Sequence, residues 1–246
     1  MNQGGRQGVS TAEPRIVVVP EADFDETVAG SLAQALLAAA NQGPVNLTLS
    51  GGETPRGGYQ RLARNPNLPW DRVDIFFGDE RAVPPSHPES NFRMAMESLL
   101  SRIPIPPEQV HRMVAEDPDL DAAARRYETL LPDTLDVLVL GIGDDGHTAS
   151  LFPGGSPVRE LSRRVVQAQR PKPPRDRLTI TPPVIQGARQ VFVLARGTGK
   201  ASAVARALQG PYDPTQCPAQ LARHGTWILD EAAAHGLALT GEDGKP

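Results

Sequence analysis

The chain has 246 residues, a length that fits one large domain or two small ones. Hydrophobic residues make up 39% and charged residues 22%, as in ordinary soluble globular proteins, and 23 glycines with 25 prolines indicate many turns. The formal net charge of −4 argues against a general nucleic-acid binder and against a protein that binds anionic membranes. The single cysteine, Cys217, excludes an internal disulfide framework and a zinc site built of cysteines, and it favours a cytoplasmic location.

The two ends of the chain differ in composition from the rest. Residues 1–13 are polar and glycine-rich, with no apolar run that could serve as a signal peptide. Residues 241–246 are similar, and no segment approaches the roughly 18 uninterrupted apolar residues of a membrane helix. We therefore expect flexible tails at 1–13 and 241–246 and a single domain over residues 14–240.

Between the tails, short apolar runs alternate with helical patterns. In the first helical pattern Asp23 and Glu26 are spaced as a capping box, and Gly43-Pro44 closes the helix. The apolar runs are continuous, which is typical of parallel strands covered on both faces. We expect strands at 16–19, 45–49, 73–77, 136–140, 165–168, 177–181, 190–195 and 226–229, and helices at 23–41, 55–64, 91–101, 120–131 and 200–208. The predicted fold class is α/β, a doubly wound, mostly parallel sheet with helices on both faces.

The stretch from Pro153 to Arg177 is strongly basic. It fits either a solvated loop with an edge strand or a patch that attracts an anionic substrate. Its acidic residues are only Glu160 and Asp176. Its basic residues are Arg159, Arg163, Arg164, Arg170, Lys172, Arg175 and Arg177.

Ligands of open α/β sheets bind at the carboxyl ends of the strands, and the chain has four polar segments at such positions. The first is Ser50-Gly51-Gly52-Glu53-Thr54-Pro55, where two glycines let backbone amides approach an anion and Thr54 or Ser50 supplies a hydroxyl. A plain strand-to-helix turn explains it equally well. It lacks the lysine of a Walker loop, so a nucleoside triphosphate is not implied.

The second segment is Gly78-Asp79-Glu80-Arg81, directly after an apolar strand. Arg81 is placed to bind an anionic oxygen through two parallel hydrogen bonds, although a charged surface turn is the simpler explanation. Downstream, Ser90-Asn91 begins a helix and fits a helix cap.

The third segment, Gly141-Ile142-Gly143-Asp144-Asp145-Gly146-His147, contains a literal G-x-G-x-x-G. A dinucleotide site would need a helix next, but Pro153-Gly154-Gly155-Ser156-Pro157 interrupts the chain. His147 can act as a general base if a carboxylate such as Asp144 or Asp145 orients it. A metal site from Asp145 and His147 lacks a second histidine cluster to complete it.

The fourth segment combines Arg177 with Gly197-Thr198-Gly199-Lys200. The latter is an incomplete Walker loop, because Leu194 and Ala201 stand where that motif needs Gly and Ser or Thr. Arg177 and Lys200 are either exposed strand-end charges or, with the Ser50 to Thr54 loop, parts of a phosphate cage. A hydrolytic serine is not supported, because no G-x-S-x-G occurs.

Together these segments resemble the 6-phosphogluconolactonase family. The matching blocks are LTLSGGETP, FFGDERAVPPSHPESN, DVLVLGIGDDGHTASLFPG and RLTITPPVIQGARQVFVLARGTGKA, in order, and the resemblance covers about residues 15–232. It implies a Rossmann-like α/β fold without a bound dinucleotide. It also implies a carboxylic ester hydrolase that converts 6-phospho-D-glucono-1,5-lactone to 6-phospho-D-gluconate in the oxidative pentose phosphate pathway, without an organic cofactor or metal.

The resemblance also implies roles for single residues. His147 would be the base that activates water, Asp145 would orient it, and Arg81 would contact substrate oxygens. Asp79 would also take part in substrate binding. The expected phosphate ligands are Ser50, Gly51, Gly52, Thr54, Arg177 and Lys200. The expected partner is the small-molecule substrate, with neither nucleic acid nor membrane, and the expected assembly is a monomer or a small homo-oligomer.

Two alternatives use the same scaffold. A glucosamine-6-phosphate deaminase shares the Asp-Gly-His turn but continues into an Asn-Glu-Pro segment, whereas here Thr148-Ala149-Ser150-Leu151-Phe152-Pro153 follows without that carboxylate. A non-catalytic sugar-phosphate sensor would bind without hydrolysis. The lactonase hypothesis fits the blocks best.

Overall fold

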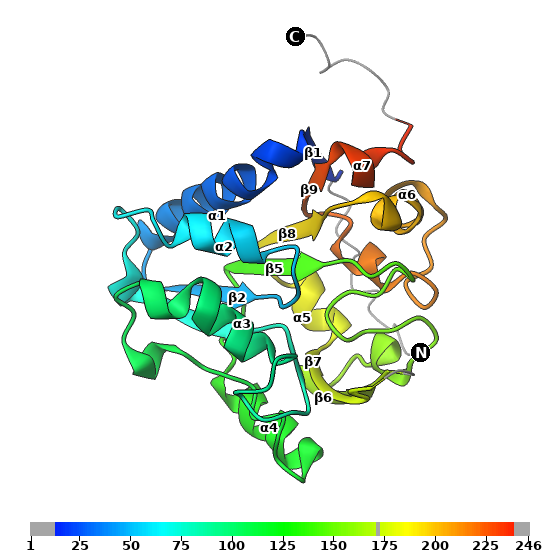
Figure 1. Ribbon diagram of the computed structural model, residues 1–246. Coiled ribbons are helices and arrows are strands. Elements are labelled where there is room, and N and C mark those ends of the chain that lie inside the picture. Colours follow the sequence, from blue (N-terminus) through cyan, green and yellow to red (C-terminus); the bar gives the residue numbers. More distant parts are fainter. Residues whose placement is uncertain (1–12, 171–172, 239–246) are drawn as a thin grey trace, which may run out of the picture.

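The computed structural model describes residues 13–170 and 173–238. Its centre is a parallel six-stranded sheet with the order β1-β9-β8-β5-β2-β3 (Figure 1). The strands are β1 (Arg15–Val19), β2 (Val45–Leu49), β3 (Val73–Phe77), β5 (Val137–Gly141), β8 (Gln190–Ala195) and β9 (Thr226–Asp230). The predicted α/β class with a mostly parallel sheet is confirmed.

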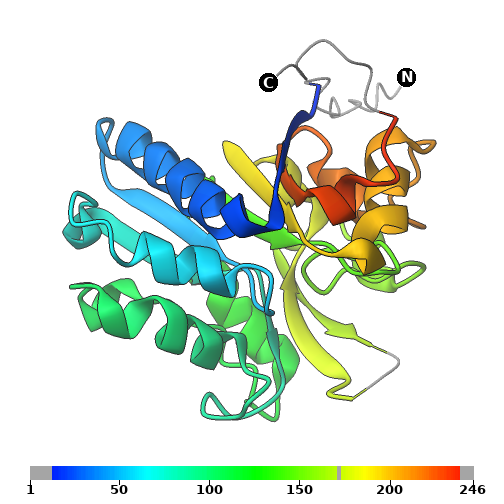
Figure 2. The same cartoon turned by 45° about the horizontal axis from the view of Figure 1, so that its top comes forward.

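Helices cover the sheet, and its central strands are buried on both faces. Every residue of β2 is buried, as are the first four of β5. Figure 2 shows α1, α2 and α3 side by side as one layer, and α4 packs against the smaller sheet described below. The helices are α1 (Phe24–Ala40), α2 (Arg56–Leu62), α3 (Asn91–Ser98), α4 (Leu120–Leu130), α5 (Pro182–Gln186), α6 (Ala201–Gln209) and α7 (Glu231–Ala234).

The strand order creates a crevice between β2 and β5. The chain crosses the sheet from β1 to β2 and β3 in one direction and returns through β5, β8 and β9 in the other. The loops after the neighbouring strands β2 and β5 therefore leave in opposite directions, and a ligand crevice opens at such a switch point. This places the loops after Leu49 and Gly141 on its two sides.

A second, antiparallel sheet has the order β4-β7-β6, which the sequence pattern did not predict. Its strands are β4 (Asp79–Arg81), β6 (Val165–Gln169) and β7 (Asp176–Ile180). Only Gly78 separates β4 from β3; its N–H donates to Leu49 O at 3.0 Å, and its carbonyl accepts from Ile180 N at 2.9 Å. Gly78 thus marks the point at which the chain leaves one sheet for the other.

Several local predictions can be compared with the structure. The capping box at Asp23 is wrong: a 3₁₀ turn over Glu21–Asp23 precedes α1, so Asp23 is already helical and its side chain caps no N–H. The cap at Ser90 is confirmed, since its hydroxyl accepts from Arg93 N at 3.2 Å. The predicted tails at 1–13 and 241–246 lie outside the described residues, apart from Glu13. None of the described helices is both long and apolar enough to cross a membrane.

Candidate active site

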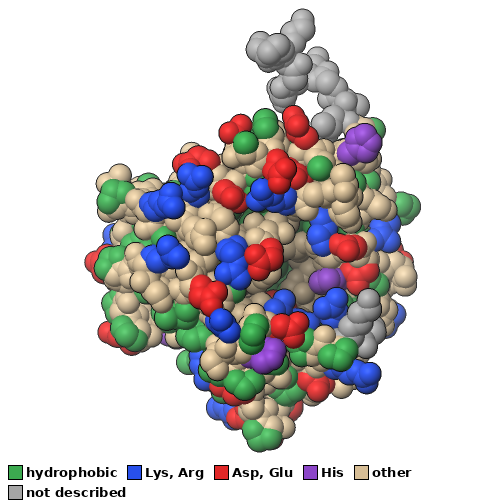
Figure 3. Space-filling model, viewed as in Figure 1, with side chains coloured by type: hydrophobic (Ala, Val, Ile, Leu, Met, Phe, Trp, Pro, Cys, Tyr) green, Lys and Arg blue, Asp and Glu red, His purple; other side chains and the backbone are tan. Residues whose placement is uncertain are grey.

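A pocket of about 380 Å³ opens at the carboxyl ends of β2 and β5, and Figure 3 shows this side of the molecule hollowed between charged side chains. A second pocket of about 450 Å³ adjoins it and shares Gly143, His147, Phe152, Arg170 and Lys200 with it. Asp145 lines this second pocket. The other predicted site residues line the first: Ser50, Gly51, Gly52, Thr54, Asp79, Arg81, His147, Arg177 and Lys200.

A tight turn after β5 presents His147 to the pocket. Gly143 N donates to the His147 carbonyl at 2.8 Å, and Gly146 N donates to the Gly143 carbonyl at 2.9 Å. Gly146 has φ +92°, a conformation that favours glycine. A Cβ at Gly143 would lie 2.0 Å from His147 Nδ1, so the imidazole occupies the space that the missing side chain leaves.

The imidazole of His147 is held by a carboxylate and an aromatic ring. Its Nδ1 lies 2.6 Å from Asp145 Oδ1, which also accepts from His147 N at 3.0 Å. The hydrogen bond from the His147 side chain holds the pKa of Asp145 at about 2, although burial acts in the opposite direction. The Phe152 ring centre is 4.9 Å from that of His147. With Asp145 ionised at Nδ1, the other ring nitrogen can accept a proton.

The loop after β2 forms the opposite wall. Ser50 N donates to the Tyr59 hydroxyl at 3.1 Å, which fixes the start of the loop, and Gly52 has φ +90°. A Cβ at Gly51 would lie 1.7 Å from Asn91 Oδ1, so only glycine fits there without moving Asn91. The loop thus exposes backbone and the Thr54 hydroxyl to the pocket.

Lys200 lies at the end of a 3₁₀ turn over Thr198–Lys200, before α6. The turn is held by the buried carboxylate of Asp230, both of whose oxygens accept from Gly197 N at 3.0 Å. The Lys200 ammonium is paired with the exposed carboxylate of Asp144. An incoming anion can therefore compete for Lys200 at low cost, because an exposed ion pair is weak.

Asp79 is the centre of a buried network that joins three elements. Its Oδ1 accepts from Asn91 Nδ2 at 3.0 Å, and its Oδ2 accepts from Ser150 Oγ at 2.6 Å. Ser150 N in turn donates to Thr179 Oγ1 at 3.1 Å. The network ties β4 and α3 to the loop that carries His147.

Asn91 and Glu80 are site-forming residues that the sequence interpretation missed. The sequence predicts Asn91 only as part of the helix start, yet its side chain lines the pocket and donates to Asp79. The Glu80 carboxylate accepts from Ser90 Oγ, Asn91 N and Phe92 N at 2.8–3.0 Å, which fastens the start of α3 to β4. Burial raises the pKa of Glu80. Both residues lie in the block FFGDERAVPPSHPESN. Its acidic residues, followed by Ser and Asn, were the sequence signal that could have indicated this hydrogen-bond network.

Two arginines meet in the second sheet. Arg81 on β4 is the register partner of Arg177 on β7. Arg177 is only 4% exposed, and this burial lowers its pKa. The Nε atoms of both side chains are buried without a hydrogen-bond partner in the described part of the chain. A desolvated guanidinium of this kind is stabilised by an anion.

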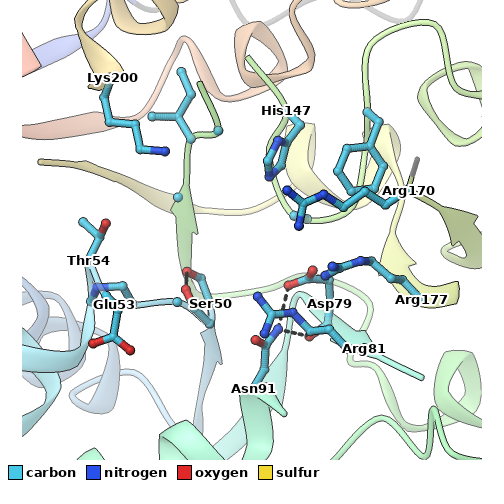
Figure 4. A pocket seen from close by; sticks show the side chains of 18 residues that line it. Ser50, Glu53, Thr54, Asp79, Arg81, Asn91, His147, Arg170, Arg177 and Lys200 are labelled. Atoms are coloured by element: carbon cyan, nitrogen blue, oxygen red, sulfur yellow. Dashed lines mark hydrogen bonds between the residues drawn. The ribbon is translucent and has the colours of Figure 1, made fainter. Parts of the chain in front are cut away.

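The close-up in Figure 4 divides the charged residues between two sides of the pocket. Lys200 and Thr54 lie on one side, and Arg81, Asp79 and Arg177 lie on the other. Ser50 lies between them, with His147 and Arg170 above the second group. The predicted phosphate ligands are therefore all in one pocket, but Arg177 stands with Arg81 rather than beside Lys200.

The basic stretch from Pro153 to Arg177 has two roles, because some of its arginines form ion pairs away from the pocket and others line it. Arg163 pairs with Glu128 at 2.7 Å and with Asp121 at 3.1 Å, which fastens the small sheet to α4. Arg170 and Arg177 instead line the pocket, and Lys172 lies outside the described residues. Within the described ranges, no group of three His, Cys, Asp or Glu side chains is arranged to hold a metal ion.

Comparison with known proteins agrees with this geometry. The profile of the family described as "Glucosamine-6-phosphate isomerases/6-phosphogluconolactonase" matches residues 20–229. The chain is 40% identical over 222 residues to the "6-phosphogluconolactonase" of Streptomyces coelicolor, with 81% of this chain and 85% of that protein covered. For the "6-phosphogluconolactonase" of Mycobacterium tuberculosis the identity is 40% over 242 residues, with 90% and 98% covered.

A solved structure shows the same arrangement of elements. The 6-phosphogluconolactonase from Trypanosoma brucei superposes with a TM-score of 0.80 at 29% identity, and the match covers 92% of this chain and 100% of that chain. Family profile, sequence relatives and structure all extend over most of the folded chain. The chain therefore belongs to the glucosamine-6-phosphate isomerase/6-phosphogluconolactonase family.

Proposed function

We propose that this protein is a 6-phosphogluconolactonase, which hydrolyses 6-phospho-D-glucono-1,5-lactone to 6-phospho-D-gluconate by direct attack of water. The observation that carries the mechanism is the His147 imidazole, held through Nδ1 by an ionised Asp145 at 2.6 Å in a pocket with cationic side chains on two sides. A general base beside anion-binding groups is what hydrolysis of a phosphorylated lactone requires.

The phosphate would bind on the side of the pocket that Lys200 and Thr54 share. Gly51 and Gly52 have no side chains to cover their backbone amides there, and Ser50 begins the same loop. The phosphate would displace the Asp144 carboxylate from Lys200, because a dianion attracts the ammonium more strongly than an exposed monoanion does. The sequence predicts Arg177 as a phosphate ligand, but its position beside Arg81 favours contact with the other end of the substrate instead.

The reaction then needs one base and one charged intermediate. As a water oxygen attacks C1, neutral His147 takes its proton at Nε2, and Asp145 stabilises the resulting imidazolium. The carbonyl oxygen becomes an oxyanion, for which Arg81 supplies positive charge. When the intermediate collapses, the bond from C1 to the ring oxygen breaks and the imidazolium returns the proton to that oxygen. The carboxylic acid formed at C1 loses its proton to solvent.

The assay must separate enzymatic from spontaneous hydrolysis, because a δ-lactone opens in water unaided. Freshly generated 6-phosphogluconolactone should be consumed well above the rate of a matched blank without protein. A deaminase would instead release ammonia from glucosamine 6-phosphate, and a sensor would bind the sugar phosphate without turnover. Lactone consumption at the blank rate would reject the proposed activity.

The remaining expectations concern setting and assembly. We place the protein in the cytoplasm, because a multiply charged sugar phosphate does not cross a membrane unaided and must be hydrolysed where it is formed. It would act on this small molecule as a monomer or small homo-oligomer, without a cofactor. Native mass spectrometry, and activity after treatment with a chelator, check the last two points.

A further inference from the structure

Arg170 is a half-buried residue that lines the pocket from the end of β6. It follows the last residue of β6, and its N–H donates to the Arg175 carbonyl at 2.9 Å, which closes the hairpin between β6 and β7. Its side chain lines both adjoining pockets, as does that of His147. Figure 4 shows the Arg170 side chain reaching towards His147, on the same side of the pocket as Arg177. From sequence it was only one of seven basic residues in its stretch.

Arg170 adds a third guanidinium to the two of Arg81 and Arg177. Burial is the main cause that lowers the pKa of Arg177, and the Asp79 carboxylate acts against it. The nearby positive charges of Arg81 and Arg170 lower this pKa further, so the three guanidinium groups are close enough to interact. The carboxylate that lines this side of the pocket is Asp79, and its two oxygens already accept hydrogen bonds from Asn91 and Ser150. Glu53, the other acidic residue of the lining, is paired with Arg56 at 3.0 Å. The neutral donors on Asp79 leave its charge in place, but three guanidinium groups face this one lining carboxylate, so positive charge on this side is in excess.

The buried donors point to an anion as the missing partner. Arg177 is 96% shielded from solvent with its Nε unpaired, and Arg81 Nε is also buried and unpaired within the described ranges. Such donors are costly to leave unsatisfied, so a ligand that accepts from them gains more than it would at an exposed site. The half-buried Arg170 lines the same pocket and is placed to complete the coordination of this ligand.

We propose that Arg170, together with Arg177 and Arg81, forms a subsite for a carboxylate, and that this carboxylate is the one created at C1 when the lactone ring opens. The inference rests on the proposed function. The C1 end of the ligand must lie at His147, which is adjacent to Arg170, while the phosphate lies across the pocket with Lys200 and Thr54. The product is then an acyclic sugar acid held by a phosphate at one end and a carboxylate at the other.

The chemistry favours a carboxylate over a neutral group. A guanidinium presents its donors as a planar fork that matches the two oxygens of a carboxylate, whereas a hydroxyl or lactone oxygen accepts from it more weakly. The lactone has no charge at C1, so this subsite gains its full strength only after hydrolysis. Arg170 should therefore discriminate between ligands that carry a C1 carboxylate and those that do not.

Two ligands of equal length test this discrimination. 6-Phospho-D-gluconate carries the carboxylate, and D-glucitol 6-phosphate carries CH₂OH in its place. In Arg170→Ala the Kd of 6-phospho-D-gluconate, measured by titration calorimetry, should rise about tenfold or more, and that of D-glucitol 6-phosphate should stay close to the wild-type value. Arg170→Lys, which keeps the charge but loses the fork, should give an intermediate Kd for 6-phospho-D-gluconate.

Arg175→Ala is the matched control. It removes the same charge from the same hairpin, but Arg175 is exposed and lines neither pocket. It should leave both Kd values unchanged. Equal weakening of both ligands by Arg170→Ala would overturn the proposal in favour of diffuse attraction, and unchanged binding of both would show that Arg170 touches neither.

The test separates this inference from the proposed function. If the wild type hydrolyses the lactone but Arg170→Ala shows no selective loss, only the carboxylate subsite is wrong. If Arg170→Ala selectively weakens binding of 6-phospho-D-gluconate but the wild type does not hydrolyse the lactone faster than the blank, the carboxylate subsite is correct and the proposed lactonase activity is wrong.

Discussion

At the scale of single residues, His147 is the group on which the proposed chemistry depends. His147→Ala removes the base that takes a proton from water, so kcat should fall by about 10²–10⁴-fold. KM should change little, because the proposed phosphate ligands are untouched. Steady-state turnover against a spontaneous blank measures both, and His235→Ala, an exposed histidine away from the pocket, is the control. Turnover near that of the wild type in folded His147→Ala would contradict the assignment.

Lys200 should act on binding rather than on the chemical step. A phosphate remote from C1 is bound equally in the ground state and the transition state, so Lys200→Ala should raise KM about tenfold or more with kcat nearly preserved. Arg196→Ala provides a comparison, because Arg196 precedes the same turn but pairs with Glu21 at 3.0 Å and does not line the pocket. An unchanged KM in Lys200→Ala would place the phosphate elsewhere.

The Asp145 carboxylate should make the free energy of unfolding depend on pH. Its folded pKa of about 2 lies below the ordinary 3.8, so its ionised form stabilises the fold above that value, and the contribution is lost as the pH falls through about 2. Asp145→Asn should lower the free energy of unfolding at pH 7, and the deficit should shrink as the pH drops below about 4. Denaturant titrations at several pH values measure it. A deficit that stays the same between about pH 4 and about pH 2 would contradict a stabilising role for the ionised Asp145 carboxylate.

At the scale of elements, the turn after β5 determines where the imidazole stands. Gly143→Ala adds a Cβ about 2.0 Å from His147 Nδ1 and 2.7 Å from Asp145 Oδ1, so the ring must move. Displacement of a catalytic group by about 1 Å can cost about 10²-fold, and we expect kcat to fall by that order. Thermal unfolding and kcat should both be measured, because the fold itself should survive.

Gly30→Ala is the control for that substitution. Gly30 lies within α1, and an added Cβ meets nothing within 4 Å. Alanine at an open helical site should stabilise the protein by about 0.5–1 kcal/mol and leave kcat unchanged. A Gly143→Ala enzyme as active as Gly30→Ala would show that His147 tolerates the shift.

Most helices and strands could be predicted from local sequence. The predictions that were wrong or missing also have causes in the local sequence. β2, β3 and β8 have the predicted bounds, because each is a short, mostly apolar run that stands out from its neighbours along the chain. The Asp23 cap failed because a 3₁₀ turn over Glu21–Asp23 had already begun the helical path. The three residues of β4 carry no apolar pattern, so their pairing with β7 could not be read from them.

At the scale of the whole molecule, the site results from strand order. β2 and β5 are neighbours although about ninety residues separate them, and their loops bring Ser50 and Thr54 opposite His147. The second sheet brings β4 beside β7 across a similar distance, which sets Arg81 against Arg177. These pairings depend on the packing of the entire chain, and no local pattern encodes them.

The sequence by itself determined the fold class, the family and the turn that carries the Asp145–His147 pair. Apolar runs and glycine-bounded loops act within a few residues, so strand positions and the Asp145–His147 pair follow from neighbours along the chain. Only the tertiary structure decided how charge is divided in the pocket. Lys200 lies on one side, Arg81 and Arg177 lie on the other, and Arg170 reaches the pocket near His147 from the end of β6. Sheet order determines which distant loops meet, and that order is a property of the packed whole.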